Sequence, residues 1–136
     1  MTSFAEQIKK FADKTKQKYR TVLIGATFNL SKDIVLGTPY DTGHARNNWI
    51  GAVDRMSRAK PLEYGEQYPL NARFAFETIR PATEQMPGKI FYLFNNVDYI
   101  RALEYDGVSG QARQGMVRIN AMRWKDYVAE AARKAK

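Results

Sequence analysis

The sequence contains no cysteine, and among its 136 residues there is a single histidine. The absence of cysteine excludes disulfide bonds, catalysis by a thiol and metal sites built on thiolates, and it fits a reducing compartment. No run of about 18 apolar residues occurs, so the sequence predicts no transmembrane helix and no membrane partner. Residues 1–7 lack a basic start followed by an apolar core, and we therefore expect no secretory signal there.

Residue types that carry catalysis are also scarce. A lone histidine near a turn, as His44 is here, is usually a structural or surface residue. No serine lies in a nucleophile-elbow sequence, and the glycine-rich residues 107–110 lack the Lys-Ser/Thr of a phosphate loop. Glu104 and Asp106 would need a third group to form a paired-carboxylate site, and no His/Asp/Glu cluster has the spacing of metal ligands. We expect no enzymatic activity, no catalytic residue, no cofactor and no metal.

Positive charge, by contrast, is in excess at the two ends of the chain. The formal net charge is +8. Residues 1–20 contain six Lys/Arg and two Asp/Glu, residues 113–136 contain seven and two, and the stretch between them is close to neutral. Such ends could face nucleic acid or an acidic protein surface, or they could be solvated helix faces. No nucleic-acid-binding motif is present, so binding of that kind would be non-specific contact with phosphates.

The first third of the chain is expected to form one long helix over residues 3–34. Ser3 and Glu6 have the spacing of a capping box. Apolar or small residues then recur at steps of three and four, which places them on one stripe: Phe4, Ile8, Phe11, Thr15, Tyr19, Val22, Leu23, Ala26 and Leu30. Such a helix is longer than a compact domain of this size needs. Either another subunit covers part of the stripe, or the chain's own core covers all of it.

Residues 38–49, which we call the elbow, are expected to form a stiff turn after this helix. Pro39 stops a helix and pushes the residue before it towards an extended conformation. The side-chain oxygens of Asp41 and Thr42 can accept hydrogen bonds from nearby backbone N–H groups, and Gly43 permits a positive φ.

Two charged residues of the elbow are placed to pair across the turn. Asp41 is expected to accept either local N–H groups or the guanidinium of Arg46. That contact would fix the direction in which Trp49 enters a strand over residues 48–53.

The next stretch, residues 54–70, loses periodicity and is predicted to be a long exposed loop. Its aromatic residues Tyr64 and Tyr68 are expected to be available for docking on a neighbour. A helix over residues 70–83 follows, which Pro81 should end or kink.

The last third contains the strongest strand, residues 89–96, whose near-continuous apolar run predicts that both of its faces are covered. One helical turn is expected within residues 97–105, and a short strand over 116–119. Asn120 is expected to cap a final helix, in which apolar residues of 124–131 recur at helical spacing.

These elements predict the α+β class: a long N-terminal helix and a C-terminal helix packed on a small, mostly antiparallel β-sheet. At this length we expect a single domain over residues 1–136, with the sheet and the C-terminal helix completed by residues 89–134.

The elbow, Thr38-Pro-Tyr-Asp-Thr-Gly-His-Ala-Arg-Asn-Asn-Trp49, resembles the T-P-x-D-T-G-x-x-R-x-x-W signature of a phage family. This family comprises the tail-completion, or neck, proteins of long-tailed bacteriophages, also called head-to-tail joining proteins, and includes the minor tail protein Z-like group. The second half is similar in order and spacing through Asn95-Asn96, Tyr99, Leu103-Glu104-Tyr105, Ser109, Gln111-Ala112 and Gly115-Met116-Val117. The chain departs from the family pattern at the inserted Asp106, at Arg113 in place of a common proline, and at His44 in place of a common basic residue.

The resemblance implies a structural protein of the virion without catalytic activity. It would form a ring of identical copies, a hexamer or dodecamer, at the neck of the particle, and would assemble in the host cytoplasm. Its other partners would be the head connector or adaptor and the tail terminator or tail tube, with contact to DNA in the channel left open. The alternative is a basic protein that binds nucleic acid non-specifically. The residues that the motif marks as structural or interface positions are Thr38, Pro39, Asp41, Thr42, Gly43, Arg46, Trp49, Tyr99, Glu104, Gln111, Gly115 and Met116.

Overall fold

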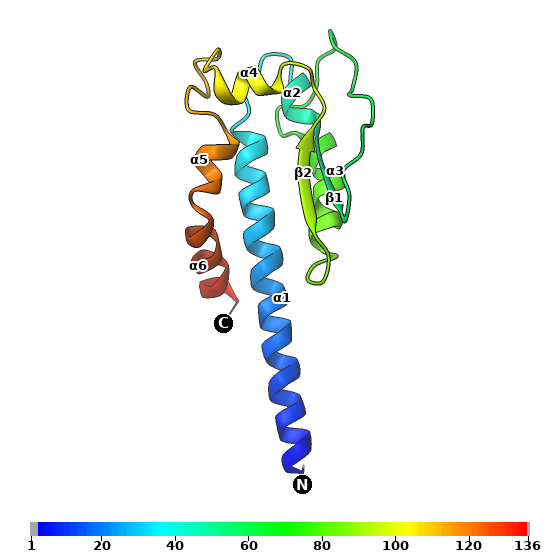
Figure 1. Cartoon of the computed structure of the whole chain (residues 1–136), viewed down its shortest axis with the longest axis vertical. Coiled ribbons are helices and arrows are strands. Elements are labelled where there is room, and N and C mark those ends of the chain that lie inside the picture. Colours follow the sequence, from blue (N-terminus) through cyan, green and yellow to red (C-terminus); the bar gives the residue numbers. More distant parts are fainter. Residues whose placement is uncertain (1–2, 136) are drawn as a thin grey trace.

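The computed structural model describes residues 3–135, and its longest element is helix α1, Phe4–Leu36 (Figure 1). The predicted capping box is present, because Ser3 Oγ accepts from the Glu6 N–H at 3.1 Å and the Ser3 N–H donates to the Glu6 carboxylate at 3.3 Å. The helix ends at Gly37, two residues before Pro39. Its 33 residues span about 50 Å at 1.5 Å per residue.

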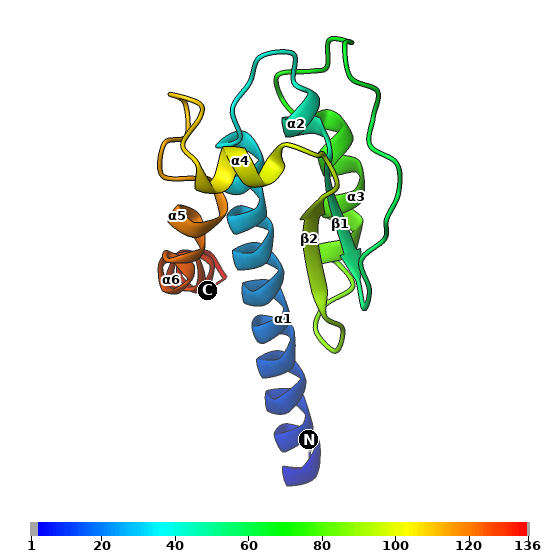
Figure 2. The same cartoon turned by 45° about the horizontal axis from the view of Figure 1, so that its top comes forward.

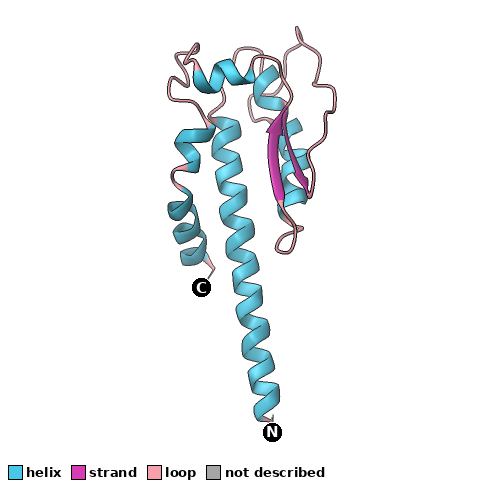
Figure 3. Cartoon of the chain, in the orientation of Figure 1, coloured by secondary structure: helices cyan, strands magenta, loops and turns pink. Residues whose placement is uncertain are grey.

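The remaining elements are short, and helices predominate among them (Figure 3). They are α2 His44–Asn47, β1 Trp49–Val53, α3 Arg73–Thr83, β2 Phe91–Asn95, α4 Ile100–Tyr105, α5 Val117–Ala121 and α6 Trp124–Lys134. The two strands form an antiparallel pair in which Trp49 lies opposite Asn95 and Val53 opposite Phe91. The predicted α+β class, with a long N-terminal helix, a C-terminal helix and a small antiparallel sheet, is confirmed.

Helix α1 is the central element, with the sheet and α3 on one side and α5 and α6 on the other (Figures 1 and 2). The main core lies between α1, the sheet and α3, and its buried members are Ile34, Val35, Trp49, Ala72, Ala75, Ile79 and Met116. Strand β1 approaches α3 closely at Gly51, where an added Cβ would lie 2.7 Å from the Cα of Ile79. The absence of a side chain there lets the sheet and α3 pack in direct contact.

A smaller core joins α1 to α6. Ala26 of α1 packs with Tyr127 and Ala131 of α6. The Tyr127 hydroxyl donates to the Asp33 carboxylate at 2.6 Å. Burial and this hydrogen bond raise the pKa of Tyr127 to about 12. This contact fixes α6 alongside the C-terminal half of α1.

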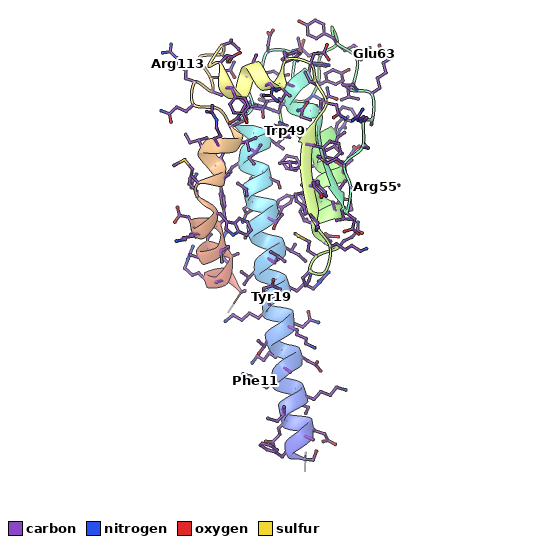
Figure 4. The ribbon with its side chains drawn as sticks, viewed as in Figure 1. Phe11, Tyr19, Trp49, Arg55, Glu63 and Arg113 are labelled. Carbon is purple, nitrogen blue, oxygen red and sulfur yellow. The ribbon has the colours of Figure 1, made fainter. Side chains whose placement is uncertain are left out.

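The N-terminal half of α1, residues 4–19, is exposed along its whole length. Its apolar stripe is uncovered: Phe4 is 78 % exposed, Phe11 72 % and Tyr19 60 %. Figure 4 shows Phe11 and Tyr19 on the part of α1 that extends beyond the other elements. The possibility that the chain's own core covers the whole stripe is therefore wrong.

Two predictions for the last third of the chain are wrong. Residues 116–119 are not a strand, since helix α5 begins at Val117. Asn120 does not cap the final helix, because it lies within α5 and its Nδ2 donates to the Met116 carbonyl at 2.8 Å. Helix α6 begins only at Trp124, after Arg123.

Strand β2 is less covered than its apolar run predicts. Phe94 is its buried residue, whereas Phe91, Tyr92 and Leu93 are half-buried. Within the described chain the sheet has two strands. Phe91 and Leu93 point to the face that packs against the main core, and the buried Phe94 points to the opposite face. Helix α3 continues for two residues beyond Pro81, close to its predicted end. Among residues 3–135, no helix combines the length and apolar content needed to cross a membrane.

Candidate functional site

The elbow is held to the end of α1 by Thr38, which is fully buried. Its hydroxyl donates to the Ile34 carbonyl at 2.8 Å and accepts from the indole N–H of Trp49 at 2.8 Å. One small side chain thus ties the last turn of α1 to the first residue of β1. Pro39 follows directly, where its ring prevents the helix from continuing.

Arg46 makes a second tie between these segments. Its Nε and Nη2 donate to the Thr38 carbonyl at 3.0 and 2.9 Å, and its Nη1 donates to the Leu70 carbonyl at 3.0 Å. The guanidinium carbon also lies 5.1 Å from the ring centre of Tyr40, a cation–π distance. Burial lowers the pKa of Arg46 from its ordinary value. Arg46 therefore clamps backbone from both sides of the elbow.

The predicted pairing of Asp41 with Arg46 is wrong. The short helix α2 places Arg46 against carbonyl oxygens at the end of α1 and just before α3, and Asp41 is exposed at the outer side of the turn. The local side-chain hydrogen bond comes from Thr42 instead, whose hydroxyl accepts from the His44 N–H at 3.3 Å. Gly43 adopts φ +84°, as its position in the turn predicts.

The loop over residues 54–70 packs back onto the elbow. The Tyr68 N–H donates to the Thr42 carbonyl at 2.7 Å, and the Asn47 side chain donates to Gly43 and Pro69 carbonyls at 2.9 and 2.8 Å. Tyr68 is consequently buried, so the prediction that it is available for docking is wrong. Tyr64 is 77 % exposed, as predicted.

Tyr99 and Gln111 reach the elbow from the last third of the chain. Gln111 pairs with the backbone of Tyr40 as a strand would, accepting from its N–H at 2.8 Å and donating to its carbonyl at 3.0 Å. Tyr99 Oη lies 2.6 Å from Nδ1 of His44, whose Nε2 lies 2.7 Å from the Leu62 carbonyl. Because a carbonyl can only accept, Nε2 carries the proton, and in the neutral ring Nδ1 accepts from Tyr99. Burial raises the pKa of the Tyr99 hydroxyl, which keeps this donor protonated.

Glu104 of α4 forms a separate cluster with Gly115 and Met116, which directly precede α5. The Glu104 carboxylate accepts from the N–H groups of Met116, Val117 and Arg118 at 2.8–3.0 Å, and from Arg118 Nε at 2.9 Å. Burial alone would raise the pKa of Glu104, but these hydrogen bonds outweigh it and lower the pKa below its ordinary value. Gly115, at φ +83°, leaves room for the carboxylate, since an added Cβ would lie 2.5 Å from Glu104 Oε2. Met116 and Trp49 share the main core, which links this cluster to the elbow.

A cavity of about 800 Å³ opens between the elbow, the loop at residues 60–64 and the segment 97–103. We call it the aromatic cavity, because rings of His44, Tyr64 and Tyr99 line it with centroids 5.3–6.4 Å apart. The sequence did not indicate the part that His44 plays, since its partners come from distant segments. Figure 4 labels Glu63, another lining residue, on the outer loop.

The polar side chains of the elbow are engaged chiefly with backbone groups, which is the chemistry of a scaffold. Among residues 3–135, no group of three His, Cys, Asp or Glu side chains could hold a metal ion. Comparisons with family models, with curated proteins and with solved structures found no match to this chain. This geometry and the motif resemblance are therefore the features that bear on function.

The exposed position of Asp41 leads to a first test. We expect Asp41→Ala to leave the urea midpoint of unfolding unchanged, because no hydrogen bond to its carboxylate is lost. Thr38→Val in the same turn is the matched comparison, and it should lose about 1–3 kcal/mol since it leaves the Trp49 N–H and the Ile34 carbonyl with one partner fewer. A clear drop in the urea midpoint of Asp41→Ala would contradict the finding that the Asp41 carboxylate takes no part in the hydrogen bonds of the elbow.

Proposed function

We propose that the chain is a structural protein of the bacteriophage neck, where copies form a ring that completes the tail and joins it to the head connector. The observation that carries this proposal is the N-terminal half of α1, a stretch of about 24 Å whose apolar stripe has no cover within the chain. Exposed aromatic side chains aligned on one rigid element are typical of protein–protein interfaces.

The elbow supports the same proposal. Its motif residues hold α1, β1 and the loop over residues 54–70 in one fixed arrangement through Thr38, Arg46 and Gly43. A ring subunit needs such rigidity, because its two contact surfaces must keep one relative orientation for the ring to close. A structural role, in which the motif residues keep the subunit rigid, is thus sufficient to explain the motif, and no catalytic reaction needs to be assigned to these residues.

Non-specific binding to nucleic acid is the alternative, favoured by the exposed lysines of α1. Lys9, Lys10, Lys14, Lys16 and Lys18 are all exposed, as are Arg133 and Lys134, whereas Lys136 lies outside the described residues. Phosphates would neutralise these charges but would leave the aromatic stripe uncovered. We therefore favour an acidic protein surface as their partner. Tight binding to double-stranded DNA with a steep salt dependence near physiological ionic strength would reverse this preference.

The location of the protein in virus particles tests the proposal. We expect a reconstruction of the parent virion to show a ring of this chain at the neck, between the connector and the tail tube. Particles that lack the protein should accumulate as separate filled heads and tails. Finding the chain in the capsid shell, or finding none in mature particles, would exclude the proposed role.

A further inference from the structure

Two surfaces of the chain complement each other in aromatic character and charge but lie at opposite ends of the molecule. One is the stripe on the N-terminal half of α1, and the other is the aromatic cavity. We infer that the stripe of one copy docks into the aromatic cavity of the next copy. This inference rests on the proposed ring, for which it names the contact between neighbours.

The stripe presents aromatic and aliphatic side chains between two rows of positive charge. At 3.6 residues per turn, Phe4, Ile8 and Phe11 share one face of α1. On the same helical geometry, Lys14 and Lys18 lie beside one edge of this face, and Lys9 and Lys16 lie roughly a quarter turn beyond the other edge. A partner surface must therefore accept aromatic side chains in its centre and offer negative charge at its edges.

The aromatic cavity meets both requirements. Its interior has aromatic walls and a volume of about 800 Å³, within the range of sites that enclose a ligand of several rings. Its rim carries three exposed acidic residues, Asp41, Glu63 and Asp98, from three separate segments. Lys60 is the only Lys or Arg among the described residues that line it.

The stripe cannot reach the cavity of its own chain. The cavity adjoins the elbow, which follows the C-terminal end of α1, and the first residues of α1 lie about 50 Å away along a continuous helix. Figures 1 and 2 show the N-terminus at the far end of the molecule from α2 and α4 in both views. The contact must therefore be between copies. Because it joins two different surfaces it is head-to-tail, the type of interface that forms a ring when the rotation between neighbours closes.

Pairing of two stripes with each other is less favourable. Residues 1–20 contain six Lys/Arg and two Asp/Glu, so two such helices packed face to face would bring their flanking lysines together. Like charges at an interface oppose association, whereas the acidic rim attracts the same lysines. The charge pattern thus selects the cavity as the partner surface.

A mixing experiment with two full-length variants tests this contact. The helix variant, Phe4→Ala/Ile8→Ala/Phe11→Ala, removes exposed side chains that the fold does not use. The cavity variant, Asp41→Lys/Asp98→Lys, reverses exposed rim charges. The control, Glu77→Lys/Glu84→Lys, makes the same charge change on and just after α3, away from the cavity lining. Association is measured by sedimentation over a range of concentrations.

We expect the wild type and the control to associate, and each of the two variants alone to associate at least about tenfold more weakly. A mixture of the variants should form a one-to-one dimer that does not grow. The intact stripe of the cavity variant docks into the intact cavity of the helix variant. The altered stripe of the helix variant and the altered cavity of the cavity variant then remain free, and neither supports a further contact. Circular dichroism that matches the wild type shows that each variant is folded.

Three results would overturn the inference: a wild type that stays monomeric at millimolar concentration, a cavity variant that associates normally, or a mixture that fails to dimerise. Each is distinct from failure of the proposed function, which depends on where the chain lies in the virion. A neck ring that forms normally from the cavity variant would leave that function in place and exclude this contact.

Discussion

Gly43→Ala should lower the free energy of unfolding by about 3 kcal/mol, one of the largest effects expected of a single methyl group in this chain. Gly43 has φ +84°, where a side chain costs about 1 kcal/mol or more. An added Cβ would also lie 2.6 Å from the ring of Tyr40 and 2.8 Å from the carbonyl oxygen of Tyr68. Relief would require the elbow and the adjoining loop to separate. Urea unfolding of the variant beside the wild type measures the loss.

Gly65→Ala is the matched control for this prediction. Gly65 has φ +100°, so its substitution carries a similar backbone cost, but no atom lies within 4 Å of the added Cβ. We expect a loss of about 1 kcal/mol there. The difference between the two variants then reports the packing of the loop on the elbow. Equal losses at both positions would contradict the close contact at Gly43.

The features that the sequence predicted well are those that depend on local rules. Helix α1 was predicted within two residues at its end, because a capping box, a continuous apolar period and Pro39 define it. The strands β1 and β2 were predicted from β-branched and aromatic runs bounded by turn residues. The exposure of the described terminal lysines also follows from the cost of burying an unpaired charge.

The features that it missed depend on partners distant in the chain. Residues 116–119 have strand-like composition, but the Glu104 carboxylate accepts from the N–H groups of 116–118 and so stabilises the start of a helix instead. In the same way, Arg46 has an acidic neighbour in sequence but binds the carbonyl oxygens of Thr38 and Leu70. Local composition contains no information on either partner.

The candidate site shows the same division. The motif predicted the elbow and marked Tyr99 and Gln111 as structural or interface positions, and both residues contact the elbow. The aromatic cavity could not be predicted, because it forms only when the loop over residues 54–70 folds back and places Tyr64 beside His44. Periodicity gives no register for such a loop, so its contacts are visible only in three dimensions.

The cluster around Glu104 leads to the second large prediction. Glu104→Gln should lower the free energy of unfolding by about 3 kcal/mol at neutral pH. The glutamine has the same shape, but one of its two terminal groups is an NH₂ that would face backbone N–H donors and Arg118. Buried donors would then lack an acceptor, since both carboxylate oxygens are used in the wild type. Glu77→Gln, at an exposed position on α3, is the control and should leave the urea midpoint unchanged.

The pH dependence of this difference identifies its cause. The pKa of Glu104 is lowered in the folded state from its ordinary value of 4.5, so its ionised form is stabilised by folding. Its contribution is then fully present above pH 4.5 and is lost as the pH falls below that value through the lowered pKa. We expect the gap in unfolding free energy between wild type and Glu104→Gln to stay constant from pH 8 to pH 6 and to narrow below about pH 4.5. A gap that keeps its full size at pH 3 would show that shape, and not the carboxylate charge, makes Glu104 necessary at this position.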